Sequence, residues 1–497
     1  MSKLLEHTFL FSLATLISRV LGLFRDAAFA HFFGISAQYD AYSIAILFPF
    51  FLRKIFADGA LSSAFVPLFN RKNGEDAQVF FSTTFWSVLI ITSLLYIPVS
   101  IFSDKIVLVL GTGLSPSIKS LTSFLLKISY PYIIFISLWA VITGVLNSKD
   151  IYFGPAFAPA LSNIVIIIFI FISPYFVPQI LGPTIGFTIG GIVEFLLVFF
   201  LLKKIRFPIT LDFNVHDLKP ILKLFGPALL GVAVGTLNTL IDTNIATWTG
   251  TGGVSTIEYA LRIYQLPLGI FAVSVANALL PKLSYSASVK NEKEFQQTLE
   301  SSLELMLFFI IPATFGLIFL NKEIIALIYQ HGNFTYQDTL ITAKTLLCYS
   351  LGLPFYALHT IFIRKFHSQL NTKYPSIVAA IMLLINAVLD VLLSIKIGVA
   401  GIALATSISG IFGMILTGYS TFKSLDFQNW IEILKIFGAS LLMSLFILIF
   451  KNLFTSRLWT ILLIVLGALV YIASTYLLGY KKLSTAIKLV FKGKNKK

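Results

Sequence analysis

The sequence predicts an all-α polytopic membrane protein of about fourteen transmembrane helices, arranged as two six-helix lobes followed by two C-terminal helices. The first observation is composition: hydrophobic residues make up 57% of the 497 residues and charged residues only 12%, whereas soluble domains carry about 25% charged residues. The second is a series of long apolar runs, and the third is a repeat of short patterns. So few charges cannot cover a soluble protein of this length, which excludes a soluble multidomain enzyme.

The apolar runs are close to the length of about 20 residues that a spanning helix requires. We count about fourteen of them, near 7–33, 39–66, 78–102, 121–146, 157–177, 184–202, 221–247, 257–280, 299–320, 340–363, 376–395, 399–422, 431–450 and 458–479. An even number of spans places both termini on the same side of the membrane. Arg19 and Arg25 interrupt the first run, so we expect a retained first helix and no cleaved signal peptide.

The distribution of basic residues predicts which side the termini occupy. If the N-terminus is inside, the inner segments hold 24 Lys and Arg residues and the outer loops hold 6. Because cytoplasmic loops are enriched in Lys and Arg, both termini are predicted to be cytoplasmic. The net charge of +15 is therefore mostly a topological signal. The basic amphipathic tail, 481–497, is expected to contact anionic headgroups of membrane lipids, and no nucleic-acid partner is expected.

Two short patterns recur at similar offsets and predict an internal duplication. Residues 146–149 (LNSK) recur as 370–373 (LNTK), and residues 64–67 (AFVP) are similar to 278–281 (ALLP). Paired repeats around a central site are a common transporter plan. The predicted division is an N-terminal lobe, a cytoplasmic linker, a C-terminal lobe, two further helices and a tail, at 1–202, 203–220, 221–422, 423–480 and 481–497.

Four arginines lie inside predicted spans, where an ionisable group costs roughly 2.5–3.5 kcal/mol and usually faces the bundle interior or a wet cavity. They are Arg19 and Arg25 in the first span, with Ser18 and Asp26 beside them, Arg53 in the second span and Arg262 in the eighth. Guanidinium groups stay charged and bind phosphate bidentately, so this set favours an anion site.

Simpler interpretations of these charges remain open. Lys54 and Asp58, and likewise Glu258 and Arg262, are spaced four residues apart on a helix and can form local ion pairs. The two arginines of the first span can instead snorkel to the membrane interface. We prefer the anion site because several unpaired arginines in lipid would be costly without an anionic partner.

A second set is rich in carboxylate and amide groups. It consists of Asn238 and Asp242 in the seventh span, Asn386 and Asp390 in the eleventh, and Thr406 in the twelfth. Oxygen donors without sulfur or imidazole suit a hard cation such as Na⁺. The alternative is hydrogen bonding between helices, which is also the role we expect for Asn163 and Glu194.

Motifs for enzymatic chemistry are missing from the sequence. The chain has one cysteine, Cys348, its histidines show no metal-ligand spacing, and no GxxxxGK[ST] phosphate loop occurs. We therefore expect a transporter and no enzyme, without a cofactor, although the oxygen-rich set has donors for a bound Na⁺. A cation-coupled drug antiporter and a non-transporting scaffold or channel stay open at this point. Cationic drugs would favour carboxylates over arginines in the cavity.

Three segments resemble signatures of the MurJ/MviN family of lipid II flippases. They are SRVLGLFRD at 18–26, FPFFLRKIFADGA at 48–60 followed by AFVP at 64–67, and YALRIYQLPLG at 259–269 followed by LLP at 279–281. The resemblance covers the first twelve predicted spans in order. The departures are modest: Asp58 stands where family members often carry Glu, and Leu261 where they often carry Asp.

This resemblance implies the MOP exporter fold, with a central cavity and a hydrophobic groove formed by the last two helices. It implies transport of lipid II, the undecaprenyl-pyrophosphate-linked peptidoglycan precursor, across the bacterial inner membrane. Alternating access would be driven by a cation gradient or the membrane potential, in a protein that we expect to be monomeric. The substrate contacts implied are Ser18, Arg19, Arg25, Asp26, Arg53 and Arg262. The sodium site implied is Asp242, Asn386, Asp390, Thr406 and the carbonyl of Ile402. The alternative is another MOP exporter, for a different polyprenyl-linked oligosaccharide or a drug.

Overall fold

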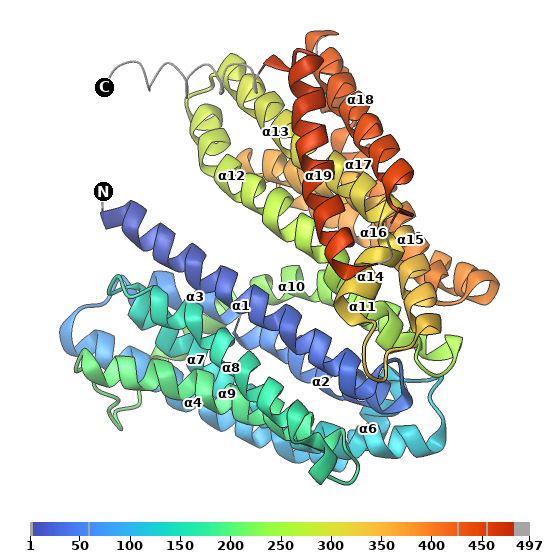
Figure 1. Ribbon diagram of the computed structural model, residues 1–497. Coiled ribbons are helices and arrows are strands. Elements are labelled where there is room, and N and C mark those ends of the chain that lie inside the picture. Colours follow the sequence, from blue (N-terminus) through green and yellow to red (C-terminus); the bar gives the residue numbers. More distant parts are fainter. Residues whose placement is uncertain (1–2, 58–59, 425–426, 454–455, 482–497) are drawn as a thin grey trace, which may run out of the picture. The chain divides into compact units, whose positions relative to one another are not determined.

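The computed structural model describes residues 3–57, 60–424, 427–453 and 456–481. Every regular element in these ranges is a helix, which confirms the predicted all-α class (Figure 1). The helices form two compact units. Unit 1 comprises Met1–Ser255 with His331–Thr335, and unit 2 comprises Thr256–Gln330 with Tyr336–Lys497.

Eleven helical segments of the described chain are long and apolar enough to cross a membrane, so this is a multi-pass membrane protein. The predicted spans 7–33, 39–66 and 221–247 overlap α1 (Lys3–Phe33), α2 (Ala37–Phe56) and α10 (Leu218–Ala246), and parts of α1 and α10 lie outside the residues whose side chains the structure describes. These three helices carry most of the charged side chains of the predicted sites.

Unit 1 is a helical bundle in which α8 packs against both α1 and α9, α7 packs against α9 and α4, and α10 packs against α3. Its remaining helices are α3 (Ala60–Phe69), α4 (Gly74–Ile101), α5 (Ser103–Leu110), α6 (Pro116–Ser129), α7 (Tyr132–Asn147), α8 (Phe153–Phe171) and α9 (Leu181–Lys204). Helix α2 begins after Ser36, whose hydroxyl accepts a hydrogen bond from the Tyr39 N–H. This N-cap satisfies one of the donors that a helix start leaves open.

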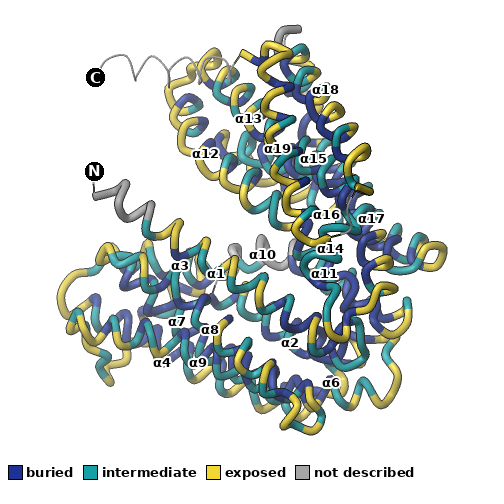
Figure 2. The backbone as a smooth tube through the Cα atoms, viewed as in Figure 1, coloured by how far each residue is buried: buried dark blue, intermediate teal, exposed yellow. Residues whose placement is uncertain are grey.

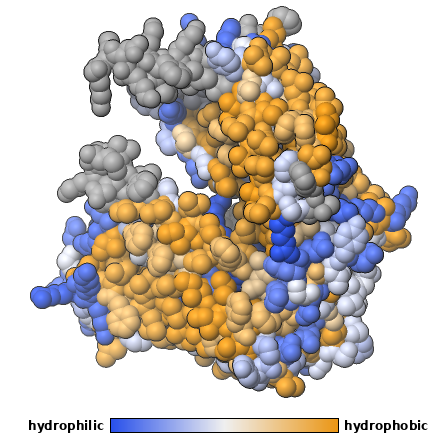
Figure 3. All heavy atoms as spheres, viewed as in Figure 1, coloured by the Kyte–Doolittle hydropathy of each residue, from blue (hydrophilic) through white to orange (hydrophobic). Residues whose placement is uncertain are grey.

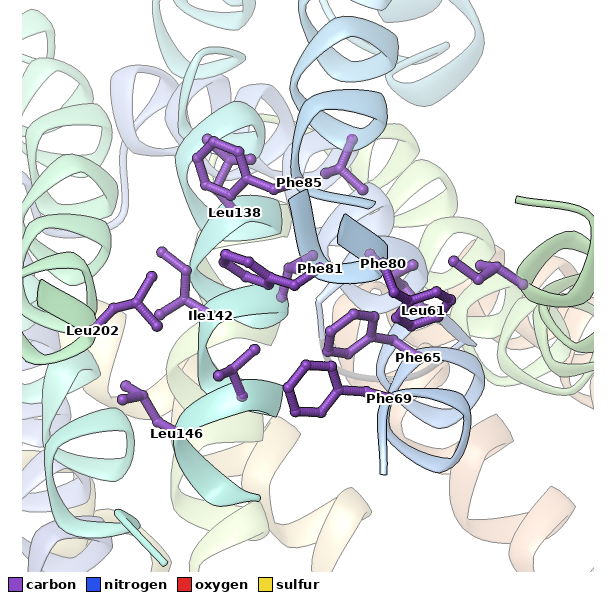
Figure 4. Close-up of a cluster of buried hydrophobic side chains, with 14 of the residues drawn as sticks. Leu61, Phe65, Phe69, Phe80, Phe81, Phe85, Leu138, Ile142, Leu146 and Leu202 are labelled. Atoms are coloured by element: carbon purple, nitrogen blue, oxygen red, sulfur yellow. The ribbon is translucent and has the colours of Figure 1, made fainter. Parts of the chain in front are cut away.

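A cluster of buried side chains joins α3, α4 and α7 (Figure 4). Phe65 stacks on Phe69 and on Phe80, with ring centroids 5.3 and 5.5 Å apart, and Ile142 is fully buried in the same cluster. Such aromatic pairs stabilise beyond their area burial. The cluster anchors α3 as a helix of its own, so the predicted single span 39–66 is two helices, α2 and α3.

Unit 2 contains two sets of packed helices. In one, α15 (Tyr336–Ser368) and α16 (Lys373–Ile397) both pack against α17 (Val399–Ser424). In the other, α18 (Phe427–Phe450) packs against α13 (Glu292–Phe319) and α19 (Arg457–Leu477). The remaining helices are α11 (Gly253–Pro267), a π-helical turn at Leu268–Ala272, α12 (Val273–Ser288) and α14 (Asn321–Tyr329).

The contact of α15 with α17 depends on a glycine. A Cβ on Gly352 would lie 2.6 Å from the Cα of Ser407, so a larger residue would force the two backbones apart. The Ser407 hydroxyl donates to the Cys348 carbonyl across the same contact, at 2.6 Å. Small residues and a hydroxyl at the contact are typical of packing between helices in membranes.

The outer faces of many helices are apolar. Figure 3 shows hydrophobic residues over much of the visible surface, and Figure 2 shows exposed positions along the same helices. Leu445 on α18 and Leu469 on α19 are 56% and 55% exposed. This is the surface expected of helices that face lipid.

The compact units and the predicted lobes have different boundaries. The sequence repeat places the division at the linker 203–220, whereas the compact units divide at Ser255. The reason is that α10 packs against α3 and α2 and so groups with unit 1. The predicted basic tail, apart from Lys481, lies outside the described residues.

Candidate functional site

The side chain of Arg25 is held inside unit 1 by three hydrogen bonds. Its Nε and Nη2 donate to Oδ1 of Asp26, at 3.0 and 2.7 Å, and its Nη1 donates to Oδ1 of Asn163 on α8, at 3.0 Å. The Arg25 and Asp26 side chains are 17% and 6% exposed. Charge-assisted hydrogen bonds of this kind are the stronger ones in proteins. The guanidinium is therefore fixed in position before any ligand arrives.

Asn163 connects α8 to two turns of α1. While its oxygen accepts from Arg25, its Nδ2 donates to the backbone carbonyl of Ser18, at 3.1 Å. Gly22 lies between these two contacts, and a Cβ there would come within 3.7 Å of the same Nδ2. Ser18, Gly22 and Arg25 thus share the α1 face that lies against α8. The hydrogen bonding between helices predicted for Asn163 is confirmed.

Arg53 on α2 is placed by an aromatic side chain. Its Nη1 donates a hydrogen bond to the Tyr132 hydroxyl of α7, and its guanidinium carbon lies 6.0 Å from the centre of that ring. Tyr132 is 2% exposed and stacks on Phe187, with ring centroids 4.1 Å apart. A Cβ on Gly191 would come within 2.5 Å of the Tyr132 ring, so the glycine makes room for it. No sequence pattern pointed to Tyr132, because its partner Arg53 lies 79 positions away in the chain.

Arg19 differs from the other arginines of unit 1. It lies on an exposed position of α1. No hydrogen bond or ion pair joins its side chain to another residue within the described chain. The predicted pair of Lys54 with Asp58 involves a residue outside the described ranges.

Arg262 belongs to unit 2 and has a looser partner. Its Nη2 lies 3.7 Å from Oε2 of Glu258, and the two side chains are 39% and 23% exposed. The local ion pair that the sequence left open for these residues is confirmed. Arg262 thus has an acidic partner in Glu258, one turn earlier, even though Leu261 stands where family members often carry Asp.

The oxygen-rich residues of unit 2 form two pairs. Asn386 donates from Nδ2 to Oδ2 of Asp390, at 2.7 Å, on α16. On α17, the Thr406 hydroxyl donates to the carbonyl of Ile402, at 3.1 Å. Asp390 and Ile402 are fully buried, and α16 packs against α17. The remaining predicted ligand, Asp242, belongs to α10 in unit 1, where it accepts a hydrogen bond from Asn238 at 3.1 Å.

These donors fit a hard monovalent cation. A buried carboxylate is costly unless its charge is compensated, and Asp390 is fully buried. The neighbouring amide, hydroxyl and carbonyl oxygens are ligands that hard cations prefer. No group of three or more His, Cys, Asp or Glu residues suited to a metal ion exists among the described residues. A transition metal, which takes nitrogen and sulfur ligands, does not fit this donor set.

Unit 2 also contains an apolar pocket of about 450 Å³. Its walls come from the π-helical turn after α11 and from α13, α18 and α19, and include Phe271, Phe309, Gly316, Met443 and Gly467. Phe271 and Phe309 stack nearly parallel, with ring centroids 4.8 Å apart. A Cβ on Gly316 would meet nothing within 4 Å, so this glycine leaves the pocket open. The pocket adjoins the last two helices, where the groove was predicted.

A multi-pass helical membrane fold, with arginines held by side chains of neighbouring helices and an apolar pocket beside its last helices, is typical of a membrane transporter. The model of the family described as "Lipid II flippase MurJ" matches residues 29–471. The chain belongs to this family. The "Lipid II flippase MurJ" of Thermosipho africanus is 42% identical over 472 residues, which cover 95% of this chain and 96% of that protein. The "Probable lipid II flippase MurJ" of Thermotoga maritima is 35% identical over 485 residues, covering 97% and 98%.

Solved structures agree with this assignment. The structure described as "Lipid II flippase MurJ, inward closed conformation" has a TM-score of 0.84 and 41% identity, and the alignment covers 95% of this chain and 99% of that one. An inward-facing MATE family transporter of the MOP superfamily has a TM-score of 0.65 at 17% identity, covering 83% and 93%. The second likeness concerns the fold alone. Together they confirm the predicted MOP exporter fold.

Proposed function

We propose that this protein flips lipid II, the lipid-linked peptidoglycan precursor, across the bacterial inner membrane by alternating access. It works as a monomer with both termini in the cytoplasm, and no covalent bond is made or broken. The observation that carries the proposal is the Arg25 guanidinium, fixed inside a membrane helix by Asp26 and Asn163, in a chain that belongs to the MurJ lipid II flippase family.

The pyrophosphate of the substrate is the group that the arginines bind. Arg25 and Arg53 present guanidinium groups fixed by neighbouring side chains, and fixed donors lose less entropy on binding than mobile ones. Arg19, which is exposed, is the residue best placed for first contact. Arg262 is a fourth cationic contact, and Ser18 and Asp26 complete the set as polar neighbours.

The polyprenyl tail stays in an apolar environment throughout. Exposing it to water would cost about 0.8 kcal/mol for each CH₂ group. The pocket bounded by α13, α18 and α19 is lined almost wholly by apolar atoms and suits a segment of such a chain. We therefore assign the pocket to the tail and the arginines to the head.

Energy for the transport cycle comes from a cation gradient or the membrane potential. A potential of 100 mV is worth about 2.3 kcal/mol for each elementary charge moved. Na⁺ would be held by Asp390, Asn386, Thr406 and the Ile402 carbonyl, with Asp242. The burial of Asp390 and its contact with Asn386 support this assignment.

Export of cationic drugs is the main alternative for a MOP fold. Guanidinium groups repel cations, so the Arg25 and Arg53 arrangement opposes it. The likeness to MATE transporters, at 17% identity, concerns the fold and does not favour drug export.

The test is complementation of a strain depleted of its own lipid II flippase. Arg25→Ala is expected to abolish growth while the protein is still made and inserted, because the pyrophosphate loses its fixed contact. The matched control is Arg71→Ala, which removes an exposed arginine from the turn after α3 and should complement fully. Full complementation by Arg25→Ala would overturn the proposed head contact. Direct binding of purified protein to lipid II should show the same difference between the two variants.

A further inference from the structure

The segment between α9 and α10, residues 205–217, is fixed to unit 1 by its backbone. The indole N–H of Trp86 donates to the Thr210 carbonyl at 2.8 Å, and the Thr210 N–H donates to the Ser82 hydroxyl at 3.0 Å. Further along, the Asn214 N–H donates to the Thr83 hydroxyl, also at 3.0 Å. All three partner side chains come from α4. The segment is therefore an ordered strap and not a loose connection between lobes.

Both ends of the segment are fixed as well. Phe207 packs edge-on against Phe69 and Phe81 in the core of unit 1, with ring centroids 6.0 and 5.5 Å away. At the other end, Lys72 and Asp217 form an ion pair of 2.6 Å. The segment is thus held to α4 in its middle, by Phe207 at one end and by Asp217 at the other.

The opposite side of this segment presents an apolar ridge. Leu211, Phe213 and Val215 are 87%, 46% and 66% exposed. The backbone N–H groups of Thr210 and Asn214 are bound to α4, and residues 211–216 between and beyond them are exposed. We call Leu211, Phe213 and Val215 the linker ridge.

Basic residues flank the linker ridge on both sides. Lys203, Lys204 and Arg206 precede it and Lys219 and Lys223 follow it, all of them exposed. Of the acidic residues in between, Asp217 is already paired with Lys72, which leaves Asp212 as the one exposed carboxylate of this stretch.

The ridge lies directly after a membrane-spanning helix. Phe200, one turn before the end of α9, is 62% exposed, as a lipid-facing side chain would be. Lys203 follows, with its Nζ 4.8 Å from the centre of the Phe199 ring. An apolar face that gives way to Lys residues marks the level at which a helix leaves the hydrocarbon for the headgroups.

We propose that the linker ridge and its five flanking basic residues bind anionic phospholipids of the cytoplasmic leaflet. The three apolar side chains insert among the headgroups, and the ammonium and guanidinium groups contact lipid phosphates. Apolar and basic signals together give stable attachment where either alone is weak. Because the segment is fixed to α4, this contact sets the depth of unit 1 in the membrane. It uses none of the residues assigned to lipid II.

A spin-label experiment tests the insertion. A nitroxide is placed at Phe213→Cys, or at Asp212→Cys, in the full chain lacking Cys348, reconstituted in nanodiscs of equal parts phosphatidylcholine and phosphatidylglycerol. Position 213 should collide preferentially with oxygen, which concentrates in lipid. Position 212 should collide with a water-soluble nickel complex. A label at Val177→Cys, 94% exposed in the α8–α9 loop without flanking basic residues, is the control and should favour the nickel complex.

Equal access of the nickel complex to positions 212 and 213 would overturn insertion. That result would favour a protein, and not lipid, as the binding partner of the linker ridge. Two neighbouring positions are compared because the nitroxide label is itself apolar and would favour lipid equally at both.

A second measurement tests the charges and does not depend on the ridge. Each basic residue near an anionic surface contributes roughly fivefold to lipid affinity. The variant with Lys203, Lys204, Arg206, Lys219 and Lys223 all changed to Gln should retain far fewer phosphatidylglycerol molecules in native mass spectrometry. Lys105→Gln with Lys119→Gln, on the predicted outer side, is the matched control and should retain the normal number. If the variant with all five substitutions retained as many phosphatidylglycerol molecules as the unchanged protein, the anionic-lipid contact would be refuted.

Discussion

Two arginines of the predicted substrate site, Arg25 in unit 1 and Arg262 in unit 2, are held in different ways. Arg25 makes hydrogen bonds of 2.7 to 3.0 Å to two side chains and is 17% exposed. Arg262 has an ion pair of 3.7 Å with a residue of its own helix and is 39% exposed. A fixed guanidinium can discriminate by geometry, whereas a more mobile one contributes charge. If these arginines bind the pyrophosphate as proposed, we expect unit 1 to contribute most of the specificity.

The largest expected effect comes from removing the carboxylate beside Arg25. Asp26→Ala removes the carboxylate that accepts two hydrogen bonds from the largely buried Arg25 guanidinium, and breaking such a pair costs about 3 kcal/mol. Denaturant unfolding in detergent, followed by tryptophan fluorescence, measures this loss. Glu258→Ala, the same change beside Arg262, should cost at most about 1 kcal/mol, because exposed pairs contribute little. Equal losses in the two variants would contradict the comparison.

The buried carboxylate of unit 2 is expected to give the next largest effect. If Asp390 helps to hold Na⁺, the ion stabilises the folded state by about 2.7 kcal/mol at a concentration one hundred times its Kd. Asp390→Asn should abolish the rise in thermal stability that NaCl produces beyond choline chloride. Asp104→Asn, an exposed acid at the start of α5, should leave the rise intact. Persistence of the full rise in Asp390→Asn would remove this residue from the ion site.

Substitutions of Asn163 test whether transport depends on the fixed orientation of the Arg25 guanidinium. Asn163→Ala removes both the acceptor for Arg25 and the donor to Ser18, which should cost about 2 kcal/mol of stability and lower flipping about tenfold. Asn163→Asp keeps the acceptor and should retain more activity, as measured by lipid II flipping in proteoliposomes. Equal activity of the two variants would show that orientation of Arg25 is unimportant.

The smallest effect is expected at Tyr132. Tyr132→Phe removes the hydroxyl that accepts from Arg53 but keeps the ring stacked on Phe187, so we expect a loss of about 1 kcal/mol and a reduction of flipping by a few fold. Tyr130→Phe is the matched control, because the Tyr130 hydroxyl donates to the Thr92 carbonyl at 3.1 Å. It should lose similar stability without a transport defect. A defect of the same size in both variants would argue against a role for the Arg53 contact.

Much of the fold was predictable because membrane insertion is read from local hydropathy. Eleven of the fourteen predicted runs are helices that meet the requirement for a span. The predicted span 39–66 is wrong as a single helix, since α3 packs through Phe65 and Phe69 into a core of its own. The lobe boundary also differs, because packing of α10 on α3 and α2 is invisible in a repeat pattern.

Within the candidate sites, the sequence predicted contacts one helical turn apart. Asn386 with Asp390, and Glu258 with Arg262, follow from the helical repeat and are present in the structure. Whether Asp242 joins the oxygen-rich pairs of unit 2 stays a prediction. Tyr132 carried no signal at all, because its pairing with Arg53 depends on how α7 lies against α2.

The sequence by itself determined the membrane class, the positions of the charges inside the spans and the family signatures, because each of these depends on residues close together in the chain. Only the tertiary structure decided how each charge is held. Asn163 meets Arg25 across 138 residues of sequence, and Trp86 meets Thr210 across 124. Such contacts depend on which helices pack side by side, and that is fixed by the summed packing of the whole unit and not by any short pattern.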